Sequence, residues 1–156
     1  MRKEFSYKFD QGPLRSEADL ENVWDTGNCR RSVQYYFWNK RGLFLKPEQV
    51  LCPVGYYETG SFVTGNTQDF SFDSLQEGDI IYAEAIRNKR DQLVDKSEKT
   101  FNTKDDYVIA LHTALFIGEK GKEIWHATAI EGRSCDWSKE KFLHYYRPVA
   151  AKRLSY

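Results

Sequence analysis

Residues 107–130 read YVIALHTALFIGEKGKEIWHATAI, and this stretch decides the fold that the sequence predicts. Its two apolar runs, Tyr107 to Ile117 and Glu123 to Ile130, are rich in the β-branched and aromatic side chains that favour strands. The segment from Gly118 to Gly121 between them has the glycines of a tight turn. The stretch therefore predicts an antiparallel hairpin, and it carries two of the chain's three histidines, His112 and His126.

The faces of the hairpin decide whether the two histidines can act together. Side chains alternate between faces along a strand, and the numbers of facing residues in an antiparallel pair sum to a constant. If His112 faces His126, that constant is 238 and both imidazoles lie on one face. A constant of 239 would place them on opposite faces, and the sequence leaves this alternative open.

The segments around the hairpin predict helices before it and strands on either side of it. A run that opens on Cys29 and ends at Gly42 has apolar residues at helical spacing, and a turn at residues 26–28 precedes it. We expect an α+β, papain-like arrangement of N-terminal helices packed on an antiparallel sheet. The other expected elements are a helix over Ser16 to Asp25, a strand after the Gly78-Asp79 turn within Leu75 to Ile86, a helix over Ser138 to Tyr145 and a last strand over Arg147 to Leu154.

Length and composition indicate one domain over residues 1–156, because 156 residues bury a sizeable core and no linker or repeat divides them. Twenty-three basic residues balance 23 acidic ones, which argues against nucleic acid as a partner. The polar stretch at about 87–106 predicts a solvent-facing insertion, with room for a short hairpin of its own. The N-terminal residues lack the apolar run of a secretion signal, and no run is long enough to span a membrane, so we expect a cytoplasmic protein unless another export route acts.

Cys29, His112 and His126 are the residues with a clear chemical interpretation. A thiol acts as a nucleophile in its thiolate form, which a helix N-terminus and a neighbouring histidine both favour. His112 would then take the thiol proton, and His126 would hold the His112 ring in the productive tautomer. The same three residue types also suit a zinc site with one open position. A metal centre is therefore the alternative to a catalytic triad.

The remaining cysteines and the third histidine have no such context. Cys135 follows Gly132-Arg133-Ser134 and is expected in a turn, and Cys52 precedes a proline. Three cysteines in this pattern predict reduced thiols and no disulfide framework. His144 has no suitable partner nearby in sequence and is expected at the surface or in packing.

The chain resembles the NlpC-like cysteine peptidases, which are papain-related enzymes that mostly cut peptide bonds of bacterial cell-wall stem peptides. The resemblance covers about Val23 to Tyr146 and lies in four segments: NCRRSVQYYFWNKRGLFL, LQEGDIIY, LHTALFIG and IWHA. It implies that Cys29 is the nucleophile, His112 the general base and His126 the third, polar member of the triad. It implies no cofactor and, as partner, a peptide or another amide-bearing small molecule.

The residues beside Cys29 depart from the family pattern. The family's acidic residue before the cysteine is Asn28 here, and its Ser-Gly after the cysteine is Arg30-Arg31. The family also often has a tyrosine before the cysteine, and Trp24 is near that place. We expect Asn28, Arg30 and Trp24 to contact the substrate, with Arg30 suited to a carboxylate or phosphate. Because of these departures, a second interpretation stays open, in which the chain is a catalytically inactive, papain-like binding module.

Overall fold

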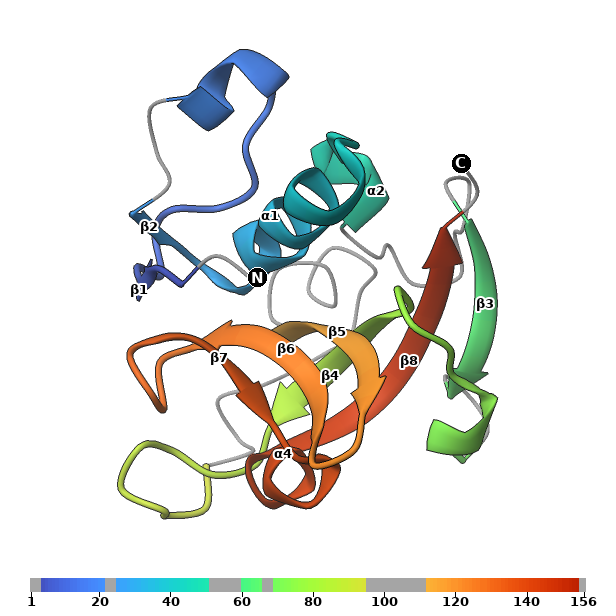
Figure 1. Cartoon of the computed structure of the whole chain (residues 1–156). Coiled ribbons are helices and arrows are strands. Elements are labelled where there is room, and N and C mark those ends of the chain that lie inside the picture. Colours follow the sequence, from blue (N-terminus) through green and yellow to red (C-terminus); the bar gives the residue numbers. More distant parts are fainter. Residues whose placement is uncertain (1–3, 22–24, 51–59, 66–68, 95–111, 155–156) are drawn as a thin grey trace.

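The computed structural model describes residues 4–21, 25–50, 60–65, 69–94 and 112–154. Within these ranges the chain forms a mixed α/β fold with one curled sheet and few helices (Figure 1). In chain order the elements are β1 (Ser6–Tyr7), η1 (Glu17–Glu21), β2 (Thr26–Gly27), α1 (Cys29–Arg41), α2 (Pro47–Val50), β3 (Gly60–Gly65), η2 (Phe72–Ser74), β4 (Ile80–Ala85), β5 (His112–Glu119), β6 (Lys122–Thr128), β7 (Arg133–Trp137), α4 (Lys139–Tyr145) and β8 (Tyr146–Leu154).

The sheet has eight strands in the order β2-β1-β7-β6-β5-β4-β8-β3. Neighbouring strands are antiparallel except for β1 and β2, which are parallel. The predicted hairpin forms its centre as β5 and β6. The C-terminal strand β8 pairs with both β4 and β3, so the chain end lies beside the middle of the sequence (Figure 1).

Helix α1 begins at Cys29, as the sequence predicts, and local signals set both of its ends. The Asn28 side chain accepts a hydrogen bond from the Arg30 backbone N–H, which caps the first turn. Gly42 ends the helix in the left-handed conformation, at φ 61°. Trp125 of β6 donates its indole N–H to the Ser32 carbonyl at 3.1 Å, which joins the first turns of α1 to the centre of the sheet.

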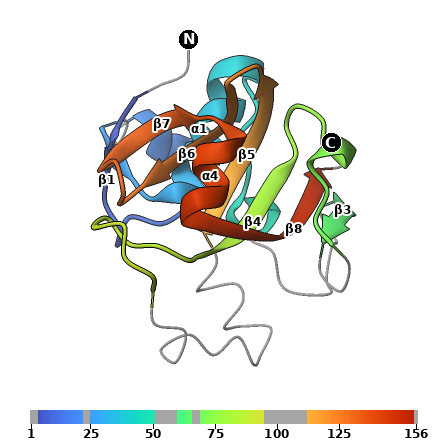
Figure 2. The same ribbon diagram turned by 90° about the horizontal axis from the view of Figure 1, so that it is seen from below.

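The two faces of β5 and β6 bury different partners. On one face, Leu115 and Trp125 pack with the apolar side chains of α1 in a cluster that includes Val33, Tyr36 and Phe37. On the other face, Ala114 and Ile124 pack with α4 and the start of β8, which lie together across this face (Figure 2). Burial of the apolar side chains in these two clusters stabilises the sheet from both faces, at about 25 cal/mol per Å² of apolar area.

The described part of the predicted insertion is a short hairpin over residues 87–94, which we call the 87–94 hairpin. Arg87 and Leu93 form a β-bridge, and the Asn88 N–H donates to the Gln92 carbonyl at 2.8 Å. The Arg87 N–H donates to the Tyr145 carbonyl at 3.3 Å, so the hairpin is attached where α4 meets β8. Residues 95–106 of the predicted insertion lie outside the described residues.

The hairpin of β5 and β6 has a different register from the one that the facing histidines predict. The facing pairs Leu115 with Trp125 and Phe116 with Ile124 have numbers that sum to 240, not 238. The constant is still even, so the expected common face for His112 and His126 is preserved. The difference arises at the turn, where the register shifts between Phe116 and Glu119 and the Glu119–Lys122 pair closes a tight connection.

Three other expectations were wrong in detail. Residues 26–28 are not a plain turn, because Thr26–Gly27 is strand β2 and pairs with β1. Cys135 is not in a turn but in strand β7, which the sequence analysis missed. The helix expected over Ser16 to Asp25 is described only as the short helix η1, although Asp19 does accept from the Ser16 N–H as a capping residue would. Residues 22–24 lie outside the described residues.

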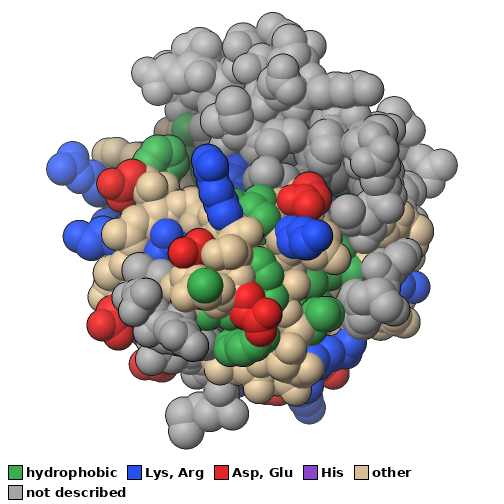
Figure 3. Space-filling view, turned by 90° about the horizontal axis from the view of Figure 1, so that it is seen from above, with side chains coloured by type: hydrophobic (Ala, Val, Ile, Leu, Met, Phe, Trp, Pro, Cys, Tyr) green, Lys and Arg blue, Asp and Glu red, His purple; other side chains and the backbone are tan. Residues whose placement is uncertain are grey.

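The surface carries both signs of charge. Among the described residues on the face drawn in Figure 3, Lys and Arg side chains are mixed with Asp and Glu side chains, without a large patch of one sign. Within the described ranges, none of the helices has the length and apolar character required to cross a bilayer.

Candidate active site

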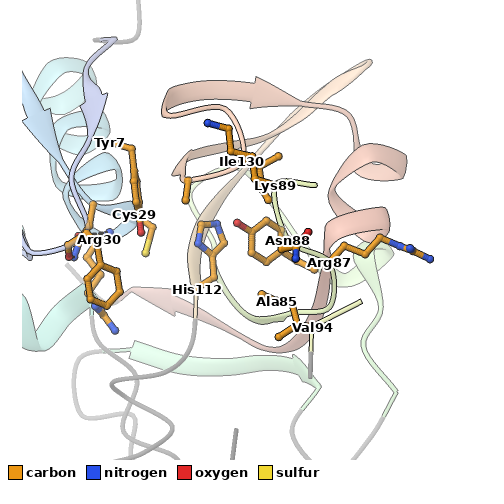
Figure 4. Close-up of a pocket in the computed structure, with 14 residues that line it drawn as sticks. Tyr7, Cys29, Arg30, Ala85, Arg87, Asn88, Lys89, Val94, His112 and Ile130 are labelled. Carbon is orange, nitrogen blue, oxygen red and sulfur yellow. Dashed lines mark hydrogen bonds between the residues drawn. The ribbon is translucent and has the colours of Figure 1, made fainter. Parts of the chain in front are cut away.

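Cys29 lies at the N-terminus of α1 and meets the beginning of β5. Its side chain is buried, with 7% exposure, and its Sγ accepts a hydrogen bond from the Thr113 backbone N–H at 3.4 Å. Figure 4 shows the sulfur on the side of α1 that faces His112, the residue before Thr113. A helix N-terminus and a backbone N–H donor both stabilise negative charge, so this position suits a thiolate.

His112 and His126 lie on the same face of the β5–β6 hairpin and contact each other directly. His112 Nε2 and His126 Nδ1 are 2.8 Å apart, a hydrogen-bond distance that requires one shared proton. This contact leaves Nδ1 as the ring nitrogen of His112 that is available to the cysteine. His126 is fully buried, and its other nitrogen, Nε2, is without a hydrogen-bond partner in the described structure.

Desolvation keeps both imidazoles neutral, although His112 is half-buried and His126 fully buried. Desolvation, followed by the positive charge of Arg30, lowers the pKa of His112 to about 3. Desolvation also lowers the pKa of His126 well below its usual range, with smaller contributions from His112 and Lys141. A neutral imidazole can accept a proton, so His112 is in the protonation state that a general base needs.

The two neutral imidazoles predict a specific loss of stability in acid. The unfolded chain protonates each histidine near pH 6.5, whereas the folded chain does not, so the unfolded state binds more protons below that pH. The free energy of unfolding should therefore fall by up to about 4 kcal/mol between pH 7.5 and pH 5.0, about 2 kcal/mol for each histidine, as measured by urea titration at each pH. His112→Gln should remove part of this fall. His144→Gln, which changes an exposed histidine, should leave it in place. An equal fall in all three proteins would contradict the assignment.

A pocket of about 330 Å³ opens between α1, β5 and the 87–94 hairpin. Cys29, His112 and Tyr146 line it together with Tyr7, a residue that the sequence analysis missed (Figure 4). The parallel pairing of β1 and β2 places Tyr7 beside Gly27, two residues before the cysteine, although the two are far apart in sequence. Burial and the nearby Cys29 raise the pKa of Tyr7 to about 12, so its hydroxyl remains a proton donor at neutral pH.

The structure places the three residues expected to contact substrate differently. Arg30 lines the pocket next to Cys29. Asn28 also lines it, but its side chain caps α1 through its oxygen and donates through Nδ2 to the Phe9 carbonyl at 3.4 Å. Trp24 lies outside the described residues. Arg31, the second arginine after the cysteine, has a structural role, because its guanidinium donates to the carbonyls of Gly12 and Thr26.

Two other candidate residues, Cys135 and His144, do not line this pocket. Cys135 is buried in β7, and burial raises the pKa of its thiol to about 12. Cys52 lies outside the described residues. His144 is exposed, but it does have a partner that the sequence did not reveal, since its Nε2 lies 2.6 Å from Asp91 Oδ1 of the 87–94 hairpin.

The geometry of the histidine pair does not fit the zinc alternative. Two zinc ligands at about 2.0–2.1 Å in tetrahedral geometry keep their nitrogens more than 3 Å apart and aim them at the metal. The 2.8 Å contact between His112 and His126 instead aims the two nitrogens at each other. Over the described residues, no group of three or more His, Cys, Asp or Glu side chains is arranged to hold a metal ion.

Comparison with known proteins supports the fold. One similar solved structure is that of NlpC1 from Trichomonas vaginalis, with a TM-score of 0.54 and 14% sequence identity. The match covers 98% of this chain and 40% of that protein, so the chain spans less than half the length of its structural neighbour. No protein-family model and no curated protein matches the sequence. The likeness therefore indicates an NlpC-like fold, and the site geometry must support any assignment of function.

Proposed function

We propose that this protein is a thiol hydrolase, a cysteine peptidase or amidase, in which Cys29, His112 and His126 form the catalytic triad. The observation that carries the proposal is the 2.8 Å contact between His112 Nε2 and His126 Nδ1. This contact fixes the orientation of the His112 ring. The neighbouring Cys29 occupies a helix N-terminus, and its Sγ accepts a hydrogen bond from the Thr113 backbone N–H. The NlpC-like fold supports the same reaction class.

The reaction proceeds through an acyl-enzyme. His112 Nδ1 takes the proton of the Cys29 thiol as the sulfur bonds to the carbonyl carbon of the amide. The oxyanion that forms is stabilised by the Cys29 backbone N–H at the start of α1 and by the neutral hydroxyl of Tyr7. The C–N bond then breaks as His112 returns the proton to the leaving amine. Water attacks the thioester, with His112 again accepting a proton, and the thiol is restored.

His126 serves as the positioning member of the triad. With the shared proton on His112 Nε2, His126 accepts it at Nδ1 and holds His112 in the tautomer whose Nδ1 is free to act as a base. Its complete burial suits this role, because the lowered pKa of His126 disfavours protonation of His126 itself.

Selective thiol labelling tests the activation of Cys29 without knowledge of the substrate. We expect iodoacetamide at pH 7.5 to modify Cys29 at least about tenfold faster than Cys135, whose buried thiol with a pKa of about 12 has almost no thiolate. His112→Ala should slow labelling of Cys29 and leave Cys135 unchanged. Peptide mapping gives each rate, including that of Cys52. If Cys29 reacts no faster than Cys135, the proposal fails.

Arg30 is proposed to bind an acidic group of the substrate. The described lining of the pocket contains the three basic residues Arg30, Arg87 and Lys89 and no Asp or Glu, although the whole chain has no net charge. In Figure 4, Arg30 and Lys89 lie on opposite sides of the pair formed by Cys29 and His112. Cell-wall-derived stem peptides, which the family resemblance implies, are one source of such acidic amides.

A substrate pair tests this role of Arg30. Arg30→Gln is expected to lower kcat/KM about 10-fold to 100-fold for a peptide amide with a carboxylate next to the scissile bond. The kcat/KM for the corresponding carboxamide peptide should fall by less than about threefold. Lys120→Gln, which removes the same charge from the exposed β5–β6 turn, is the matched control. Equal losses for both substrates would argue against carboxylate recognition.

A further inference from the structure

Tyr146, the first residue of β8, covers one face of the His112 imidazole. The two rings are stacked, with centroids 4.2 Å apart and planes inclined by only 13°. Tyr146 also lines the pocket, so it reaches the same space as Cys29 and His112. Because the stacking distance is close to van der Waals contact over the whole ring, rotation of the His112 ring would have to displace Tyr146.

The phenol ring is itself held from two other elements. Its hydroxyl lies 2.5 Å from the Thr128 hydroxyl, near the end of β6 and two residues after His126. Phe142 of α4 stacks on the ring at 5.2 Å with an inclination of 25°. Burial raises the pKa of Tyr146, so the hydroxyl stays neutral and the ring keeps the electron-rich face of a phenol. Tyr146 is therefore a fixed, neutral aromatic surface against the general base.

We infer that Tyr146 is a positioning residue of the triad, whose ring face keeps His112 aligned with His126 and stabilises the imidazolium that forms when Cys29 loses its proton. This inference rests on the proposed function and adds a residue to it. A cation over an aromatic face is stabilised by the ring quadrupole, and the effect grows when both groups are desolvated, as they are here.

The surroundings of His112 disfavour a positive charge on its ring, so a contact that stabilises the imidazolium assists the proton transfer. Among the described residues, the charged or titratable groups that share the pocket with His112 are Tyr7, Cys29, Arg30, Arg87, Lys89 and Tyr146. His126 of β6 contacts His112 directly, and Lys141 of α4 acts on His126. Arg30 and burial both oppose a positive charge on His112. Over the described residues, three contacts favour the charged imidazole: the thiolate of Cys29, the acceptor Nδ1 of His126 and the ring face of Tyr146. Removing the aromatic face should therefore reduce the population of the thiolate–imidazolium pair.

The pH dependence of Cys29 labelling by iodoacetamide measures that population directly. Tyr146→Leu is expected to slow labelling about 5-fold to 20-fold at pH 6.5 and to move the acid limb of the profile to higher pH. Tyr146→Phe keeps the ring face and loses only the hydroxyl contact with Thr128, so it should slow labelling clearly less than Tyr146→Leu does. Thr128→Val removes the same hydrogen bond from the other side, together with the bond that the Thr128 hydroxyl accepts from the Ile130 N–H, and should also slow labelling less than Tyr146→Leu does. The labelling rate of Cys135 in each variant is the internal control for loosening of the fold.

A second series keeps the shape of the side chain constant, in case Tyr146→Leu does not fold. Phenylalanine at position 146 is compared with phenylalanines that carry increasing numbers of ring fluorines, which progressively weaken the negative face of the ring. Stepwise slowing of Cys29 labelling with fluorination, at a constant Cys135 rate, is the expected result. An unchanged Cys29 rate across this series, or equal slowing in Tyr146→Phe and Tyr146→Leu, would overturn the inference. Wild-type Cys29 that reacts no faster than Cys135 would instead overturn the proposed function itself.

Discussion

Replacing Cys29 by alanine should reduce kcat/KM for a cleaved peptide amide by about 10⁴-fold or more. The reason is that the variant lacks the atom that forms the acyl-enzyme, and residual rates then reflect only binding and the oxyanion donors. The assay is mass spectrometry of the amine released from stem-peptide fragments and other short peptide amides. Cys29→Ser should be almost as inactive, because the less acidic hydroxyl lacks the thiol's ready ionisation.

Cys135→Ala is the matched control for this experiment. It also removes a buried thiol, but one that lies in β7 and outside the pocket. We expect it to keep activity within about threefold of the wild type. Hydrolysis by Cys29→Ala at the wild-type rate would show that the reaction occurs at another site.

Replacing Asp79 by alanine should cost about 3 kcal/mol of the free energy of unfolding. The carboxylate is 1% exposed, accepts two hydrogen bonds from the Arg153 guanidinium at 2.9 and 2.8 Å, and also accepts the Gln76 N–H at 2.9 Å. It holds the Gly78-Asp79 turn, whose backbone is hydrogen-bonded to Phe116 of β5. Alanine would leave the Gln76 N–H without its acceptor. It would also remove the ion pair that joins the residue before β4 to Arg153 of β8.

Thermal unfolding measures this effect, and the midpoint should fall by about 10 °C for a domain of this size. Arg153 is partly exposed and can turn to water, which keeps the loss at the lower end of the range for a broken buried ion pair. Asp73→Ala, at an exposed aspartate in the neighbouring helix η2, should change stability by less than about 0.5 kcal/mol. Similar losses in the two variants would mean that the ion pair does not hold the turn.

The parts of the site that could be predicted from sequence are those that local rules determine. A capping residue, a helical apolar pattern and a terminal glycine define α1, so the position of Cys29 at the helix start follows from residues 28–42. The common face of His112 and His126 follows from the alternation of side chains along two strands with an even register. These features need no information from distant parts of the chain.

The parts that escaped prediction depend on contacts between distant segments. Tyr7 reaches the pocket only because two-residue strands pair, and such strands are too short to leave a periodic pattern. Tyr146 stacks on His112 because β8 begins beside β4, a pairing that no local signal specifies. Strand β7, RSCDW, mixes polar and apolar residues and follows a glycine, so its sequence is typical of a turn. The register, in which the numbers of facing residues sum to 240, depends on which residues close the β5–β6 turn. Several tight turns fit the same glycines.

The central claim is that Cys29 attacks the substrate carbonyl, and trapping the acyl-enzyme tests it most directly. Wild-type protein is mixed with a cleaved peptide amide, quenched in acid within the first turnover, digested and mapped by mass spectrometry. We expect the acyl half of the substrate as a thioester on the peptide that contains Cys29, and no adduct in Cys29→Ala. Product release with no thioester at any time point, or a thioester on another cysteine, would contradict the account.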